Sequence, residues 1–233
     1  PIDNLTDTKY IAKRMSTFSW DKATKSSDVS HGKILGYESN ETTHYSIVDQ
    51  FGNSVSVTTT LNTGYGSKVF VKGAGFFLNN EMDDFSAKPG VPNVYGLLGS
   101  AANAIAPEKR MLSSMAPTIV EKDGKLKMVV GTPGGSTIIT SVLQNILNVV
   151  EYDMGMQESV NKARFHHQWM PDNIRMEPNG FDSITKANLK KLGYEIVERN
   201  SLIIGRVDAI LVLPNGKLEG GADPRGDDAA VGF

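Results

Sequence analysis

The amino-acid sequence predicts an α+β fold in which antiparallel β-sheet is layered with helices. Three observations support this: residues 43–61 alternate with period two, residues 138–150 have strong helical periodicity, and two more extended segments lie near the end. Strands followed by helices and then by strands are typical of antiparallel sheet packed against helices, rather than of an alternating parallel fold. A length of 233 residues commonly forms one domain.

The composition excludes several classes of protein. Lys and Arg number 24 and Asp and Glu 26, so the formal net charge is −2, with no long block of one sign. Generic nucleic-acid binding needs a basic surface and is therefore not expected. The absence of Cys excludes disulfides, thiolate metal sites and a thiol nucleophile. No run approaches the roughly 18 apolar residues of a membrane span.

The first 41 residues differ from the rest of the chain. They are rich in Ser, Thr, Lys and Asp, and a short amphipathic helix around residues 10–15 is their one expected element, capped by Thr6 or Asp7. We interpret the remainder as a linker. The chain opens with Pro1 and shows no basic and apolar leader, so we expect a piece of a longer or processed protein.

From Thr43 onwards the sequence alternates between strand and turn signals. Short β-branched and aromatic runs are separated by Gly, Asn and Asp, which favours hairpins. No periodicity survives over residues 86–110, which predicts a long loop of the kind that often carries function. The expected strands are 44–49, 54–61, 69–71, 75–79, 117–121, 126–132, 207–213 and 218–222.

Three helices are expected in the second half of the chain. The clearest covers 138–150, where apolar residues at three- and four-residue spacing predict one apolar face that packs on the sheet. The others cover 156–165 and 183–192. The last has Asp182 as N-cap and Gly193 just beyond its end.

The boundary between the linker and the first strand is a candidate for chemistry. P-loop, G-x-S-x-G, H-E-x-x-H and G-x-G-x-x-G motifs are all absent. If the bond between Glu41 and Thr42 were cleaved, Thr42 would carry a hydroxyl nucleophile and an α-amine that can act as its base. The ordinary pKa of a free α-amine, about 7.7–8.0, suits that role. The alternative is that Thr42 and Thr43 are ordinary β-branched residues starting a strand.

Five short motifs follow one another along the chain: Thr42–Asp49, Thr60–Thr63, Leu78–Phe85, Leu112–Met115 and Gly131–Ser136. Their residues and their order resemble those of γ-glutamyltranspeptidases, and the resemblance extends from Thr42 to the end of the sequence. It implies an N-terminal nucleophile hydrolase with a four-layer αββα sandwich, made as a precursor that cuts itself into a large and a small subunit. Residues 1–41 would be the tail of the large subunit and residues 42–233 the small subunit. The sandwich would be incomplete here, and the large subunit would be the partner.

The resemblance assigns catalytic roles to four residues. Thr42 would attack the carbonyl of Glu41 to release itself, and later the γ-carbonyl of a substrate. Thr60 would orient the nucleophile, and the backbone N–H groups of Gly134 and Gly135 would stabilise the oxyanion. The alternatives are a β-branched strand residue for Thr60 and a tight turn before a helix for the glycines.

The resemblance also implies how a glutamyl group would be recognised. Asn62, Glu81 and Asp84 would hold its α-amino group, and Ser113 and Ser114 its α-carboxylate. The carboxylate-binding Arg of the family lies in the large subunit and is not in this chain. For Glu81 and Asp84 the alternative is that they are solvated loop carboxylates.

Two further features complete the expected site. Residues 86–100, with Tyr95, resemble the lid loop that covers the pocket in some members of the family. His166 and His167 could suggest a metal, but no Cys or carboxylate stands at ligand spacing and the family chemistry needs none. No cofactor or metal is expected.

The expected function is γ-glutamyl transfer from glutathione or related amides to water, amino acids or peptides, in the periplasm or outside the cell. Two alternatives stay open. One is a related acylase acting on cephalosporin, glutaryl or poly-γ-glutamate substrates. The other is an unprocessed, non-catalytic fragment, because Thr42 lies inside the chain.

Overall fold

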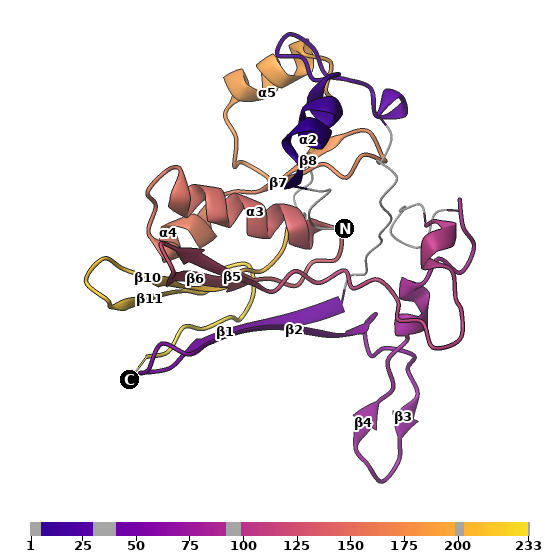
Figure 1. Ribbon diagram of the computed structural model, residues 1–233, viewed down its shortest axis with the longest axis vertical. Helices are drawn as coiled ribbons and strands as arrows, with labels where there is room; N and C mark the ends of the chain where they lie inside the picture. Colours follow the sequence, from indigo (N-terminus) through magenta and orange to yellow (C-terminus); the bar gives the residue numbers. More distant parts are fainter. Residues whose placement is uncertain (1–5, 30–40, 92–98, 199–202, 233) are drawn as a thin grey trace.

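The computed structural model describes residues 6–29, 41–91, 99–198 and 203–232. Its centre is an antiparallel four-stranded sheet with the order β11-β10-β6-β5 (Figure 1). A hairpin of two longer strands packs against one face of this sheet, and two helices cover the other. The described part of the chain thus has three stacked layers, helix, sheet and sheet. The strands of the four-stranded sheet are β5 (Thr118–Lys122), β6 (Lys125–Gly131), β10 (Asp208–Val212) and β11 (Leu218–Gly221).

The core lies between the helices and the four-stranded sheet. Met128, Val129 and Val130 of β6 are all fully buried, because this strand is covered on both faces. The helices are α3 (Thr137–Val150) and α4 (Met156–Asn161). Ile138 of α3 and Met156 of α4 form one hydrophobic cluster with Met128 and Val130 of β6.

The apolar residues of α3 do not all face the sheet. Ile138, Val142 and Val149 are buried, whereas Ile139 and Leu143 are 55% and 51% exposed. The expected packing of an apolar face of α3 on the sheet is therefore confirmed for Ile138, Val142 and Val149, whereas Ile139 and Leu143 form a second, exposed apolar stripe. The apolar pattern of a helix shows which of its side chains would be stabilised by burial. It does not show which of them pack against this chain and which remain exposed.

The hairpin is formed by β1 (Glu41–Val48) and β2 (Ser54–Asn62). Its inner face is polar: the Ser46 hydroxyl donates to the Asp208 carbonyl at 3.2 Å and the Ser56 hydroxyl to the Val130 carbonyl at 3.2 Å. These bonds satisfy the inward-facing hydroxyl groups. The outer face carries Tyr45 and Ile47, which are 46% and 51% exposed. The hairpin therefore turns the Ser46 and Ser56 hydroxyls towards the sheet and the apolar Tyr45 and Ile47 outwards.

Beyond β2 the chain forms a two-stranded arm and two short helical turns. The arm projects from the body (Figure 1). Its strands are β3 (Phe70–Val71) and β4 (Phe76–Phe77), and the turns are η2 (Glu81–Asp84) and η3 (Ala101–Asn103).

A second, smaller sheet lies on the far side of α3 (Figure 1). In it, β8 pairs with β7 antiparallel and with β9 parallel. Around it lie α5, which Asp182 caps through Thr185 N as expected, the helix α2 and the turn η1. The bounds are β7 (Phe165–His166), β8 (Ile174–Met176), β9 (Ile196–Glu198), α2 (Thr8–Met15), α5 (Ser183–Lys191) and η1 (Ser26–Asp28).

This smaller sheet differs from the sequence prediction. The helix expected over 156–165 ends at Asn161, and residues 165–166 form a strand instead. The strands β8 and β9 were not predicted. They contain three residues each, too few to show a period of two.

A buried ion network joins the smaller sheet to the core. The Arg164 guanidinium bonds the Asp223 carboxylate at 2.7 Å, and both side chains are at most 2% exposed. Arg164 also donates to the carbonyls of Ile204 and Gly205 at 2.9 and 3.2 Å. Arg225 bridges Asp223 to Glu177. These bonds fix residues 204–207 against the end of β6.

We predict that Arg164→Met lowers the free energy of unfolding by about 3–5 kcal/mol, because the buried Asp223 carboxylate loses one of its two cationic partners and keeps only Arg225. Urea unfolding monitored by circular dichroism measures this change. Lys162→Met is the matched control, since Lys162 pairs with Glu158 at 3.4 Å at the surface and should cost less than about 1 kcal/mol. Equal losses in the two variants would contradict the prediction.

Candidate active site

Thr42 lies in the second position of β1, at an irregularity in the hairpin. Thr42 is paired with Thr60 and Glu41 with Asn62, so Leu61 of β2 is an extra residue between two paired positions. Such a bulge re-aims the neighbouring side chains and is common beside active sites. The peptide bond between Glu41 and Thr42, where we expect cleavage, thus lies at the bulge in the hydrogen-bond ladder of the hairpin.

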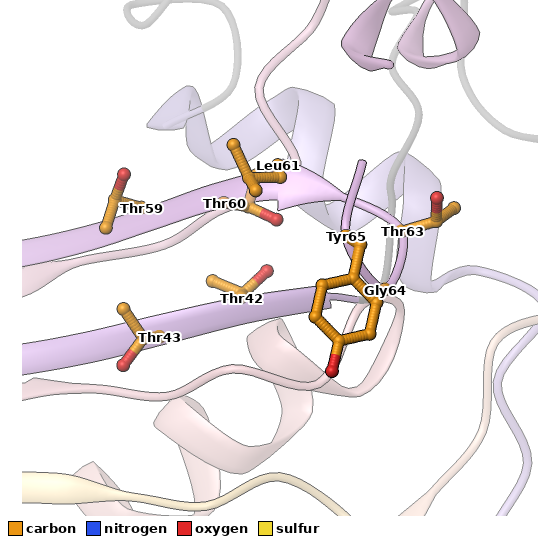
Figure 2. Close-up of a pocket in the computed structure, with 8 residues that line it drawn as sticks. All are labelled: Thr42, Thr43, Thr59, Thr60, Leu61, Thr63, Gly64 and Tyr65. Carbon is orange, nitrogen blue, oxygen red and sulfur yellow. The ribbon is translucent and has the colours of Figure 1, made fainter. Parts of the chain in front are cut away.

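Thr42 and Thr60 line the same open pocket, which has a volume of about 380 Å³. Figure 2 shows their side chains on one side of the hairpin, with the two hydroxyl oxygens turned towards each other. The ring of Tyr65 stands at the end of the pocket (Figure 2). Sequence reasoning missed this residue, because nothing in its spacing distinguishes it. The remaining lining residues are Thr43, Thr59, Leu61, Thr63 and Gly64.

Asn62 is connected to this pair through the backbone. Its N–H donates to the Thr60 hydroxyl oxygen at 2.9 Å, which leaves the Thr60 proton available for another acceptor. The Asn62 side chain is fully buried; its Nδ2 donates to the Asn80 carbonyl at 3.1 Å, while its Oδ1 has no partner among the described residues. A buried acceptor without a donor costs free energy.

Glu81 and Asp84 follow further along the chain, in the turn η2. Burial, together with the negative charges of Glu81 and Asp83, raises the pKa of Asp84 to about 6. Burial also raises the pKa of Glu81. The solvated-loop alternative is wrong for Asp84, which is 6% exposed. A buried carboxyl group beside other negative charges is a place where a cation would be stabilised.

Asn103 links this acidic turn to the serine pair. Its Nδ2 donates to the Asp84 carbonyl at 2.7 Å, and its Oδ1 accepts from the Leu112 N–H at 3.1 Å. Ser113 and Ser114 follow Leu112; Ser114 is buried and Ser113 is exposed. Asn103 was not predicted, because an Asn within a Gly- and Ala-rich loop gives no signal of the contacts it makes.

Gly134 and Gly135 form the turn between β6 and α3. Their φ angles are 141° and 57°, in the region that favours glycine. The Thr137 hydroxyl donates to the Gly134 carbonyl at 2.8 Å. A Cβ on Gly134 would lie 3.1 Å from Gly205 Cα. The turn is therefore packed from two sides, with its N–H groups at the start of a helix, where negative charge is favoured.

His44 joins the strand of Thr42 to the strand that leads into this turn. Its ring bonds the hydroxyls of Thr58 at 2.8 Å and Ser46 at 3.0 Å. A Cβ added to Gly131 would collide with the ring, so the imidazole lies directly on the last residue of β6. Burial lowers the pKa of His44 to about 4, and the ring is neutral at working pH. His44 was not among the predicted site residues.

Two other expected residues have different outcomes. The His166 ring bonds the Thr140 hydroxyl at 2.8 Å and Gln168 Oε1 at 2.9 Å, a structural role at the start of α3. Tyr95 lies outside the described residues. Of the described residues predicted for the site, only Thr42 and Thr60 line the pocket. The lining does not include the expected recognition residues Asn62, Glu81, Asp84, Ser113 and Ser114, or the Gly134–Gly135 turn.

The fold is that of the γ-glutamyltranspeptidases and related N-terminal nucleophile hydrolases. A solved mutant of the Helicobacter pylori γ-glutamyltranspeptidase is 56% identical, with a TM-score of 0.76 over 79% of this chain and 100% of that one. A cephalosporin acylase from Bacillus halodurans has a TM-score of 0.81 over 98% of this chain and 39% of its own, at 23% identity, which is a likeness of fold.

The chain belongs to the γ-glutamyltranspeptidase family, whose sequence profile matches residues 1–233. A curated relative, the glutathione hydrolase proenzyme of Escherichia coli strain K12, is 49% identical over 234 residues. That alignment covers 100% of this chain and 40% of the relative. The chain thus spans about two fifths of the length of this relative.

We predict that the stability contributed by neutral His44 and His166 is lost as the pH falls from about 6.5 to about 4, against an opposite contribution from Asp84 and Asp208, whose carboxyl pKa values burial raises to about 6 and about 7. The unfolded chain binds protons at His44 and His166 below about 6.5, whereas burial lowers the pKa of each folded ring to about 4. Each ring contributes about 1–3 kcal/mol to this loss, which is complete below pH 4. Urea unfolding across this range measures it. His44→Gln should remove the contribution of that ring, so the variant should lose less stability than the wild type between pH 6.5 and 4, and parallel curves would contradict the assignment.

Proposed function

We propose that this chain is the catalytic part of a γ-glutamyl acyl transferase. It takes the γ-glutamyl group of glutathione or a related amide onto Thr42 and passes it to water, an amino acid or a peptide. The observation that carries this proposal is the Thr42–Thr60 pair, which faces an open pocket at a bulge in the hairpin. Membership of a family whose relatives are named glutathione hydrolase proenzymes supports it.

The first reaction is the cleavage of the chain itself. The Thr42 hydroxyl oxygen attacks the Glu41 carbonyl, the C–N bond breaks, and the hydroxyl proton moves to the departing Thr42 nitrogen. Water then hydrolyses the resulting ester. The products are a carboxylate on Glu41 and a free α-amine on Thr42. Residues 1–41 and 42–233 would then belong to separate subunits.

The second reaction uses the new chain end. The α-amine accepts the proton of the Thr42 hydroxyl as its oxygen attacks the γ-carbonyl of the substrate. Thr60, whose oxygen already accepts from Asn62 N, donates its proton to Thr42 and orients it. The N–H groups of Gly134 and Gly135 stabilise the oxyanion. The amine leaving group departs with the proton, and water or an acceptor amine releases the acyl group.

Recognition of the glutamyl head follows from charge. Its ammonium would offset the negative charges of Glu81 and Asp84, whose pKa values are both raised in its absence. It would also supply the donor that the buried Asn62 Oδ1 requires. Ser113 and Ser114 would donate to the α-carboxylate. Asn103 supports this arrangement, since it bonds both the Asp84 carbonyl and the Leu112 N–H.

The large subunit would complete both the site and the fold. It would supply the cation for the α-carboxylate and a fourth, helical layer, giving an αββα sandwich. Two apolar surfaces support this: the outer face of the hairpin, with Tyr45 and Ile47, and the second stripe of α3, with Ile139 and Leu143. Surfaces of this kind are typical of permanent interfaces.

We infer a periplasmic or extracellular location from the family alone. Within the residues that the structure describes, no helix is long and apolar enough to cross a membrane. Of the alternatives, the acylase reading has support only from fold likeness at 23% identity. Asp84 and Asn62 favour a substrate with a free ammonium over a glutaryl group.

We predict that Thr42→Ala in the complete precursor leaves one uncut chain and abolishes turnover of a γ-glutamyl anilide. Mass spectrometry and release of the aniline measure the two effects. Thr8→Ala is the control: Thr8 is exposed in α2 and does not line the pocket, so both activities should persist. Cleavage and turnover in Thr42→Ala would refute the proposed nucleophile. Faster turnover of a glutaryl anilide would favour the acylase.

We predict that KM for the γ-glutamyl anilide rises as the pH falls below about 6. Asp84, whose pKa is raised to about 6, then becomes protonated and loses the charge that holds the substrate ammonium. Asp84→Asn should raise KM throughout by about tenfold or more, as expected for a lost charged hydrogen bond. It should also remove the rise below pH 6. A rise that survives in Asp84→Asn would assign the titration to another group.

A further inference from the structure

The segment upstream of the proposed cleavage site is bound to a loop near the smaller sheet. The turn η1 and the residues around it contact the loop Trp169–Asp172, about 140 residues further along the chain. Ala23 N also donates to the carbonyl of Leu192, just beyond α5. Figure 1 shows α2 beside α5 and β8, on the side of the molecule opposite the hairpin that contains Thr42.

Ser26 is the centre of this contact. Its N–H donates to Asp172 Oδ2 at 2.8 Å and its hydroxyl to Asp172 Oδ1 at 2.7 Å. Its carbonyl accepts from the Trp169 indole N–H at 2.6 Å. Ser26 is only 4% exposed although α2, the helix before it, has no buried residue. Every polar group of this one residue is therefore used.

The loop is built to make these contacts. The Trp169 indole N–H is shared between the carbonyls of Ser26 and Val29, at 2.6 and 2.9 Å. Both Asp172 oxygens accept from Ser26, and Oδ1 also lies 3.3 Å from His167 Nε2. The hydrogen bonds from Ser26 lower the pKa of this carboxyl. Hydrogen bonds to a charged acceptor are stronger than neutral ones. The loop thus recognises a short backbone turn that presents a serine.

We propose that the Trp169–Asp172 loop is a binding site that retains residues 23–29 after the bond between Glu41 and Thr42 is cut. This inference rests on the proposed self-cleavage. The contacts at the loop are made by Ser26 and Val29, which lie 12 or more residues before Glu41. Hydrolysis of the bond before Thr42 therefore breaks none of them.

The retention site has a consequence for the two products. Its upstream partner would become the last part of the large subunit, and the loop belongs to the small one. The site would therefore be a contact between the two subunits that already forms in the uncut precursor. Cleavage would separate Glu41 from Thr42, while residues 23–29 would stay bound to the Trp169–Asp172 loop.

Hydrogen exchange measured by mass spectrometry on the complete precursor tests this. Peptides covering residues 20–29 are compared in the cut wild-type protein and in uncut Thr42→Ala. We expect equal protection in both. Trp169→Phe removes the indole donor and Ser26→Ala the hydroxyl donor. Each substitution should speed hydrogen exchange of these peptides in the cut protein. Asp172→Ala removes two charged hydrogen bonds and should raise the exchange rate about tenfold or more.

The chain provides matched controls for each substitution. Trp20 is 85% exposed, so Trp20→Phe should leave exchange unchanged. Asp182→Ala removes a carboxylate with the same kind of bonds, to Thr185 N and Oγ1, at a different site. Loss of protection in the cut wild type would overturn the inference. So would equal exchange in the loop variants and their controls. An uncut wild-type chain, seen in the same spectra, would instead overturn the proposed function, and this inference with it.

Discussion

The contact between the His44 ring and Gly131 is the constraint on which the arrangement of the candidate site depends. It lies where the hairpin meets the four-stranded sheet, two residues after Thr42 and three residues before Gly134. A larger residue at 131 or a charged ring at 44 would separate the two sheets. Because the ring is buried, neutral and bonded to Thr58 and Ser46, it fixes the spacing between the strand of Thr42, the proposed nucleophile, and the glycine turn.

Around this contact, the proposed recognition residues form a chain of bonded neighbours. Thr60 connects to Asn62, Asn62 to Asn80 beside Glu81, and Asp84 through Asn103 to Leu112 beside the serines. Most of these links run through backbone groups. Their geometry thus depends on the path of the chain more than on any single side chain.

The sequence predicted the long elements well. The hairpin, α3, α5 and the strands of the four-stranded sheet were confirmed, since their patterns repeat over enough residues to be read. The three-residue strands β8 and β9 have no readable period. The family resemblance supplied the site residues, but not His44, Asn103 or Tyr65. These act through contacts between segments distant in the sequence, and a linear pattern does not record such contacts.

The hairpin that turns the Ser46 and Ser56 hydroxyls towards the sheet and displays Tyr45 and Ile47 has a further meaning for how the molecule is made. A chain released with these patches bare would be prone to self-association. Synthesis as a single precursor would avoid this self-association, because the large subunit that covers the patches would be part of the same polypeptide. The backbone would then be cleaved only after the apolar surfaces had been buried against the large subunit.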